Sequence, residues 1–79
     1  MQQTATSAEA GIAILGGTGD QGLGLALRFA RAGAKVVIGS RKPERAEEAA
    51  ARVRAVVAGA KVEGCGNAEA AKQAGIVIL

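Results

Sequence analysis

Short apolar runs alternate along this chain with longer segments in which apolar residues recur about every 3.6 positions. The apolar runs cover residues 11–15 and 35–39, and a further run begins at Ile76. Unbroken runs of this length are typical of parallel strands that are covered on both faces. The segments between them have the period and length of α-helices. The pattern therefore predicts strands that are separated by helices.

The first two predicted helices have recognisable ends. One runs from about Gln21 to Ala32, and Gly33 suits the left-handed residue that often follows a helix. The other begins at Pro43, because proline fits the first turn of a helix, and ends at Gly59. One face of this second helix carries an apolar stripe formed by Ala46, Ala49, Ala50, Val53, Val56 and Val57.

The remaining residues continue the alternation. We expect a short third strand around residues 61–63, a brief helix over 68–74 that Asn67 caps, and a fourth strand that opens at Ile76. The order β-α-β-α-β-α-β implies a parallel, right-handed, doubly wound sheet. The predicted fold class is α/β, as the N-terminal portion of a Rossmann-like sheet.

A glycine-rich turn joins the first strand to the first helix. Gly17, Gly19 and Gly22 fit the G-x-G-x-x-G pattern of dinucleotide-binding turns. Gly17 would allow a tight turn, Gly19 would let a pyrophosphate approach the backbone, and Gly22 would let helix and strand pack closely. The N–H groups at the start of the helix would then face the phosphates. The alternative is a glycine-rich turn that binds nothing.

The turn also contains Thr18, Asp20 and Gln21. The hydroxyl of Thr18 could reach a phosphate or a ribose. We expect Asp20 to point outward, since its carboxylate would repel a pyrophosphate, and to cap a helix N–H or face solvent. Gln21 could turn inward or outward. All residues from Gly17 to Gly22 belong to the predicted cofactor site.

The end of the second strand favours NADP over NAD. About 20 residues beyond the fingerprint, where NAD-binding sites usually carry a ribose-binding carboxylate, stands Gly39. Ser40, Arg41 and Lys42 follow it, and they offer a hydroxyl, a guanidinium and a second positive charge to a 2′-phosphate. Ser40 could instead be a turn residue, and Lys42 a solvated charge.

Composition narrows the class of partner. The net charge is +3, the basic residues form no run, and Phe29 is the only aromatic residue. Nucleic-acid binding would call for a basic stripe or stacking aromatic side chains, so we expect a small phosphate-bearing molecule instead. No apolar run approaches the about 20 residues of a membrane span. Residues 1–10 are small and polar, which predicts a loose tail without a secretion signal.

The chain contains no histidine and a single cysteine, Cys65, which fits the reducing conditions of the cytoplasm. We expect Cys65 to be a small packing residue or a loop thiol, and we expect no metal site. A complete dinucleotide-binding domain is about twice as long as these 79 residues. Residues 11–79 are therefore expected to be the N-terminal part of a longer domain.

Two segments together, Gly16 to Arg28 and Val37 to Arg41, closely resemble the start of the NADPH-dependent deazaflavin coenzyme reductases. The resemblance covers nearly the whole chain from Gly11. It implies an oxidoreductase that moves a hydride between NADP(H) and the deazaflavin ring of coenzyme F420. It also implies a homodimer, with the deazaflavin pocket formed by residues beyond Leu79.

By the same resemblance, residues 18–22 would hold the pyrophosphate of NADP, and Ser40 and Arg41 would hold its 2′-phosphate. No catalytic side chain is expected, because the protein mainly holds two rings face to face. Two other readings stay open. One is another NADP-dependent reductase, similar to pyrroline-carboxylate reductases, to metalloreductases or to atypical short-chain dehydrogenases. The other is a domain that senses NADP without catalysis.

Overall fold

The computed structural model describes residues 11–16 and 19–78. Strands and helices alternate along it, in the predicted order. The elements are β1 (Ile12–Leu15), α2 (Asp20–Arg31), β2 (Val36–Ser40), α3 (Pro43–Val56), β3 (Val62–Gly66), α4 (Asn67–Gln73) and β4 (Ile76–Ile78). The tail predicted over residues 1–10 lies outside the described residues.

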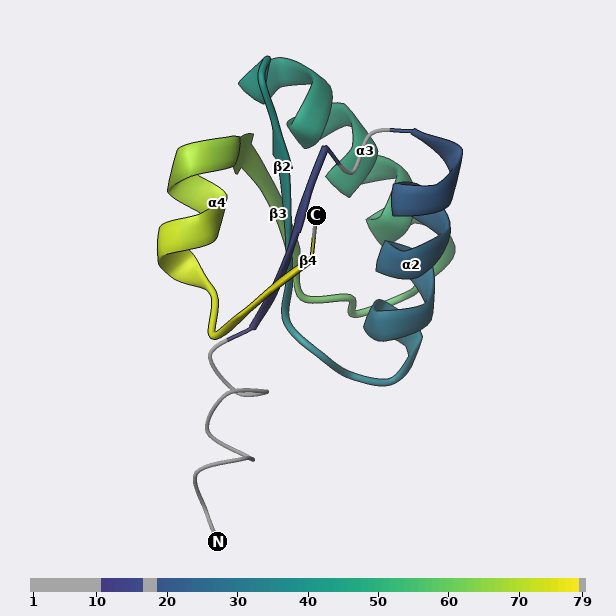
Figure 1. Cartoon of the computed structure of the whole chain (residues 1–79). Coiled ribbons are helices and arrows are strands. Elements are labelled where there is room, and N and C mark those ends of the chain that lie inside the picture. Colours follow the sequence, from purple (N-terminus) through teal and green to yellow (C-terminus); the bar gives the residue numbers. More distant parts are fainter. Residues whose placement is uncertain (1–10, 17–18, 79) are drawn as a thin grey trace, which may run out of the picture.

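The strands form one parallel sheet in the order β3-β2-β1-β4. The chain therefore builds outward from β1 to β3 on one side and then crosses to the other side of β1 to add β4. Helices α2 and α3 lie on one face of the sheet and α4 on the other (Figure 1). This arrangement confirms the predicted doubly wound α/β fold.

The core follows the alternation of side chains along each strand. Ile12 and Ile14 of β1 pack with the helices α2 and α3, whereas Ala13 lies in a smaller cluster on the face covered by α4. The four most buried large side chains come from β2 and α3, and they are Val36, Val37, Ile38 and Val53. Both faces of the sheet are covered, as the unbroken apolar runs predicted.

The stripe predicted on α3 is correct except at Val56. Ala46, Ala49, Ala50 and Val53 are buried. Val56 is 59% exposed, whereas Val57, which directly follows the helix, is half-buried and packs against the core. Gly59 lies in the turn that follows the helix, with a φ of 77° that glycine adopts without strain.

Strand β3 is longer than the predicted residues 61–63, because it continues through Gly64, Cys65 and Gly66. Glycine is unfavourable inside a strand, so strand preferences did not predict this extension. At Gly64 the packing explains the residue. A Cβ there would lie 2.5 Å from the Glu47 backbone nitrogen and closer still to the Ala46 carbonyl group. Helix α3 thus sits directly on the backbone of β3.

Within the described residues, no helix combines the length and apolar character that crossing a membrane requires.

Candidate functional site

The carboxyl ends of β1 and β2 lie side by side and bring the two predicted recognition segments together. Leu15 of β1 pairs with Gly39 of β2, and Gly16 follows directly. Since β4 lies on the other side of β1 from β2, the direction in which strands are added reverses at β1, the sheet's switch point. Helix α2 follows β1 on one face of the sheet, and α4 leads to β4 on the other face (Figure 1). Ligands of open α/β sheets bind at such a crevice.

Helix α2 opens at this edge. Its N-cap residue is Gly19, and no side chain caps it within the described residues. The first N–H groups of a helix have no partners within the helix, and they suit an anion. A pocket of about 390 Å³ lies in front of them, lined by Ile14, Leu15, Gly16, Gly19, Gln21, Gly22, Leu25 and Ile78.

Gly19 is the glycine that a ligand explains best. Its φ of −78° and ψ of 174° are extended angles that any residue adopts. Among the described residues, a Cβ added to Gly19 would meet no atom within 4 Å. Neither backbone strain nor protein packing thus requires glycine at this position. The open space fits the close approach of a pyrophosphate.

The remaining loop residues are placed unequally. Gly17 and Thr18 lie outside the described residues, and only the backbone of Asp20 is described, at the first position of α2. Gln21 is exposed and lines the pocket in front of the helix, as does Gly22. Their predicted contacts with a cofactor stay predictions.

A second pocket, of about 420 Å³, lies beside the glycine turn. Its lining residues come from three connections, and they are Gly16, Ser40, Arg41, Lys42, Arg45 and Asn67. Ser40, Arg41 and Lys42 are thus brought together as predicted, next to the start of the glycine loop. Three cationic side chains line a single hollow at the carboxyl edge.

Ser40 is the last residue of β2, so it does not follow the strand as expected. It is only 7% exposed, and its Oγ accepts a hydrogen bond of 3.2 Å from the Lys42 N–H. This bond makes Ser40 a turn-forming residue. The hydroxyl proton remains available to donate to a ligand, so the bond does not exclude the phosphate-binding role.

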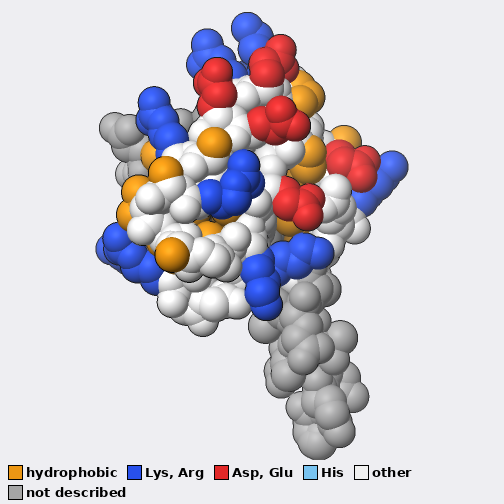
Figure 2. All heavy atoms as spheres, turned by 180° about the vertical axis from the view of Figure 1, so that it is seen from behind, with side chains coloured by type: hydrophobic (Ala, Val, Ile, Leu, Met, Phe, Trp, Pro, Cys, Tyr) orange, Lys and Arg blue, Asp and Glu red, His pale blue; other side chains and the backbone are white. Residues whose placement is uncertain are grey.

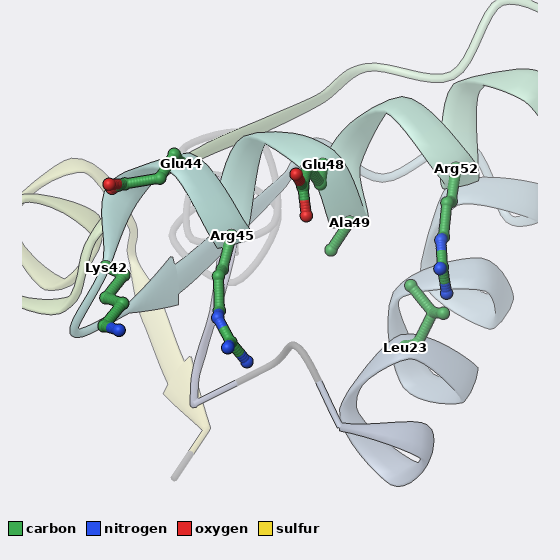
Figure 3. A pocket seen from close by; sticks show the side chains of 7 residues that line it. All are labelled: Leu23, Lys42, Glu44, Arg45, Glu48, Ala49 and Arg52. Carbon is green, nitrogen blue, oxygen red and sulfur yellow. The ribbon is translucent and has the colours of Figure 1, made fainter.

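Arg45 is a candidate that the sequence did not single out. It lies in the first turn of α3, is exposed, and lines the same pocket as Arg41. In Figure 3 its side chain leaves α3 on the same side as Arg52, toward α2. The available signal was its place two residues after Pro43, in the first turn of the predicted helix and close to Arg41 in the sequence.

Gly39 has a packing reason that the sequence did not reveal. A Cβ there would lie 2.8 Å from the Asn67 Oδ1 and 3.0 Å from side-chain carbons of Ala70 and Leu15. Packing alone therefore explains why position 39 carries no carboxylate, and the lack of a carboxylate there is a weaker argument for NADP than the sequence implied. The preference for NADP depends on the cationic residues themselves.

Asn67 does not cap α4, contrary to the prediction. The N-cap residue is Gly66, and no side chain bonds to the first turn of the helix. Asn67 is instead the first helical residue, and its Oδ1 accepts a hydrogen bond of 3.2 Å from the Gly16 N–H. A cap was expected because asparagine commonly caps helices; the neighbouring glycine loop offered a more distant donor.

Cys65 lies inside β3 and packs with Ala13, Val37 and Ala70. Burial raises the pKa of its thiol above the usual 9.0, and the carboxylates of Glu69 and Glu63 raise it further. The neutral thiol is therefore favoured at physiological pH. The contacts with Ala13, Val37 and Ala70 support the prediction that Cys65 is a packing residue.

Positive charge is not confined to the carboxyl edge. On the face shown in Figure 2, the Lys and Arg side chains are scattered and separated by Glu side chains and uncharged surface. What distinguishes Arg41, Lys42 and Arg45 is their common pocket beside the glycine loop. The site is defined by position, not by a general basic surface.

A parallel sheet whose switch point carries a glycine turn, an uncapped helix start and a cationic turn is typical of dinucleotide-binding α/β proteins. The sequence matches the family model described as "NADP oxidoreductase coenzyme F420-dependent" over residues 11–79. The chain belongs to this family, which confirms the resemblance seen in its two motifs.

Three curated relatives support the assignment. Each is named F420-dependent NADP reductase, and they come from Methanothermobacter marburgensis (57% identical over 70 residues), Methanothermobacter thermautotrophicus (54% over 70) and Methanocaldococcus jannaschii (53% over 72). Each alignment covers 86% of this chain but only 31%, 30% and 32% of the respective relative. The chain thus spans slightly less than a third of the length of these relatives.

Proposed function

We propose that the protein carrying this chain transfers a hydride between NADP(H) and the deazaflavin coenzyme F420. The observation that carries this proposal is membership of the F420-dependent NADP oxidoreductase family along residues 11–79. The relatives named for the same reaction support it. Family membership also favours this reaction over the other NADP-dependent reductases and over a sensing domain.

In this proposal the glycine turn holds the pyrophosphate. Residues 17–22 would bind the phosphates, and the start of α2 would contribute its N–H groups and the positive end of its dipole. The open space at Gly19 lets the phosphates reach the backbone. No positively charged side chain is needed for this contact.

The 2′-phosphate of NADP binds the second pocket. Arg41 and Arg45 provide guanidinium groups, Ser40 provides a hydroxyl and Lys42 an ammonium group. A phosphate accepts charge-assisted hydrogen bonds from such donors, which are about twice as strong as neutral ones. NAD lacks this phosphate and cannot make these contacts. The pocket therefore favours NADP over NAD.

The nicotinamide supplies the hydride chemistry when NADP(H) is bound. The contribution of this chain is to bind the adenosine and pyrophosphate and thereby orient the dinucleotide. Oxidation of the reduced deazaflavin by NADP transfers a hydride and releases one proton, and the proposal assigns no part in that proton transfer to the side chains of the described residues.

The same family membership supports the wider organisation that we propose. Residues 11–79 would form the N-terminal part of the NADP-binding Rossmann domain, in keeping with alignments that cover 30–32% of the relatives. The protein would be a cytoplasmic homodimer that binds neither nucleic acid nor membranes. Sedimentation equilibrium of the protein from its complete coding sequence would test the dimer.

The direct test of the function is an assay of that protein with reduced coenzyme F420 and either NADP or NAD. The absorbance of oxidised coenzyme F420 would be followed as it appears. We expect rapid turnover with NADP and little with NAD. Tight NADPH binding without turnover would retain the nucleotide site but refute the deazaflavin reaction.

A further inference from the structure

Three connections at the carboxyl edge meet at Gly16. Its N–H is shared between two acceptors, the Gly39 carbonyl oxygen at 2.9 Å and the Asn67 Oδ1 at 3.2 Å. One acceptor belongs to β2 and the other to the first residue of α4. The first peptide group of the glycine loop is thus held by two different elements.

Gly16 is where the chain changes direction after β1. Its φ of +69° is a left-handed angle that glycine adopts without strain. Gly16 lines both the pocket in front of α2 and the cationic pocket beside it. An acceptor that holds its N–H therefore helps to fix the boundary between the two pockets.

The packing around Asn67 is fitted to this contact. Gly39 leaves room for the carboxamide, because a Cβ at that position would lie 2.8 Å from the Asn67 Oδ1. Asn67 also lines the pocket that contains Ser40, Arg41 and Arg45. The side chain thus touches the glycine loop on one side and borders the cationic pocket on the other.

We propose that Asn67 is a positioning residue for the dinucleotide site, which acts by holding Gly16 and through it the pyrophosphate loop. The inference rests on the proposed NADP(H) binding. Because the pyrophosphate is common to both dinucleotides, loss of the Asn67 contact weakens NADPH and NADH binding alike. This distinguishes Asn67 from Arg41, whose proposed ligand is the 2′-phosphate alone.

Two substitutions of Asn67 separate the effect of losing the hydrogen-bond acceptor from the effect of adding a charge. Asn67→Ala removes the side-chain acceptor of the Gly16 N–H and leaves only the Gly39 carbonyl oxygen. Asn67→Asp keeps an acceptor oxygen in nearly the same place but puts a negative charge beside the cationic pocket. Aspartate at the start of a helix is favourable for the helix dipole, so this variant is expected to fold.

Gln73→Ala provides a matched control in the same helix. Gln73 donates to the Glu69 Oε2 at 3.3 Å, and this bond lies within α4, away from the pocket. The variant therefore loses one side-chain hydrogen bond of α4 without disturbing Gly16. Its affinities for both dinucleotides should match those of the wild type.

The experiment measures NADPH and NADH dissociation constants by calorimetry, and melting temperatures, for the protein from its complete coding sequence. For Asn67→Ala we expect both constants to rise by a similar factor of about three to ten, the scale of one neutral hydrogen bond. For Asn67→Asp we expect both dinucleotides to bind more weakly, because the carboxylate would lie beside the pyrophosphate loop. NADPH should lose more affinity than NADH, because it also carries the 2′-phosphate, and added salt should reduce both losses.

Asn67→Ala with a lower melting temperature but unchanged dissociation constants would show a purely structural role and overturn the inference. A folded Asn67→Asp variant that binds NADPH as tightly as the wild type would also overturn it, since a carboxylate at this position has to repel the phosphates of a dinucleotide bound there. If the wild type binds neither dinucleotide, the proposed function itself fails and the inference falls with it. If the wild type binds NADPH and Asn67→Ala matches it, the inference alone fails.

Discussion

The contact between α3 and β3 predicts opposite effects for two glycine-to-alanine substitutions. At Gly64 of β3, the new methyl group would collide with the backbone of α3 at Ala46 and Glu47. At Gly24, inside α2, it would meet no described atom within 4 Å. Both changes add the same methyl group, so the two variants differ in the packing around it and in the helix preference for alanine at Gly24, which is worth up to about 1 kcal/mol.

The two magnitudes follow from the surroundings. A glycine-to-alanine change normally stabilises a fold by about 0.4–1 kcal/mol through the unfolded chain. At Gly64 the overlap is with backbone atoms that cannot rotate away, and overpacking costs about 1–3 kcal/mol or more. We expect Gly64→Ala to lower the free energy of unfolding by about 2 kcal/mol. Gly24→Ala should raise it by up to about 1 kcal/mol, the helix preference for alanine.

Urea denaturation followed by circular dichroism would measure both variants against the wild type. The expected result is a lower midpoint for Gly64→Ala and a higher midpoint for Gly24→Ala, with similar slopes. Equal midpoints for the two variants would refute the close approach of α3 to β3. A stabilised Gly64→Ala variant would refute it more directly.

Three further predictions concern the site and the thiol. Arg41→Ala should weaken NADPH binding by about 1.5–3 kcal/mol, the scale of a charged hydrogen bond, and leave NADH binding little changed; equal losses by titration would refute the 2′-phosphate contact. Gly19→Val should abolish dinucleotide binding while the circular dichroism spectrum stays that of a folded protein, because the side chain would occupy the space left for phosphate; unaltered affinity would remove Gly19 from the site. Cys65 should react with iodoacetamide at pH 8 several-fold more slowly than in the urea-unfolded chain, because its raised pKa disfavours the thiolate. By the same linkage, stability from this group is present below the usual pKa of 9.0 and is lost as the pH rises above it. Equal alkylation rates in the folded and unfolded protein would contradict the burial of Cys65.

Local sequence patterns were sufficient for most of the fold. The apolar runs located β1 and β2 to within one residue, and Pro43 located the start of α3. The extension of β3 was missed because glycine has a low strand preference. The reason for Gly64 is the close contact with α3, which becomes clear only once the helix is packed on the strand. Val56 was assigned to the buried stripe because it has the right spacing for that face of α3. Spacing alone does not show that a residue in the last turn of the helix is exposed.

The site was predicted where a short motif carries the chemistry and missed where distant segments meet. Ser40, Arg41 and Lys42 form one turn, so their shared pocket follows from adjacency. Arg45 lies one helical turn further on and resembled an ordinary exposed side chain. The contact of Asn67 depends on α4 docking beside β1, which no local pattern encodes.

The bond from Gly16 to Asn67 joins residues 51 positions apart, whereas the bond from Lys42 to Ser40 spans only two. Short-range contacts can form as soon as their residues leave the ribosome, but long-range ones must wait for the intervening chain. During synthesis the cationic turn would therefore be shaped before the glycine loop receives its side-chain acceptor. If the proposed function is correct, the contacts of the dinucleotide site in this chain would be complete only after α4 has been synthesised, so NADP would stabilise contacts that the chain has already formed.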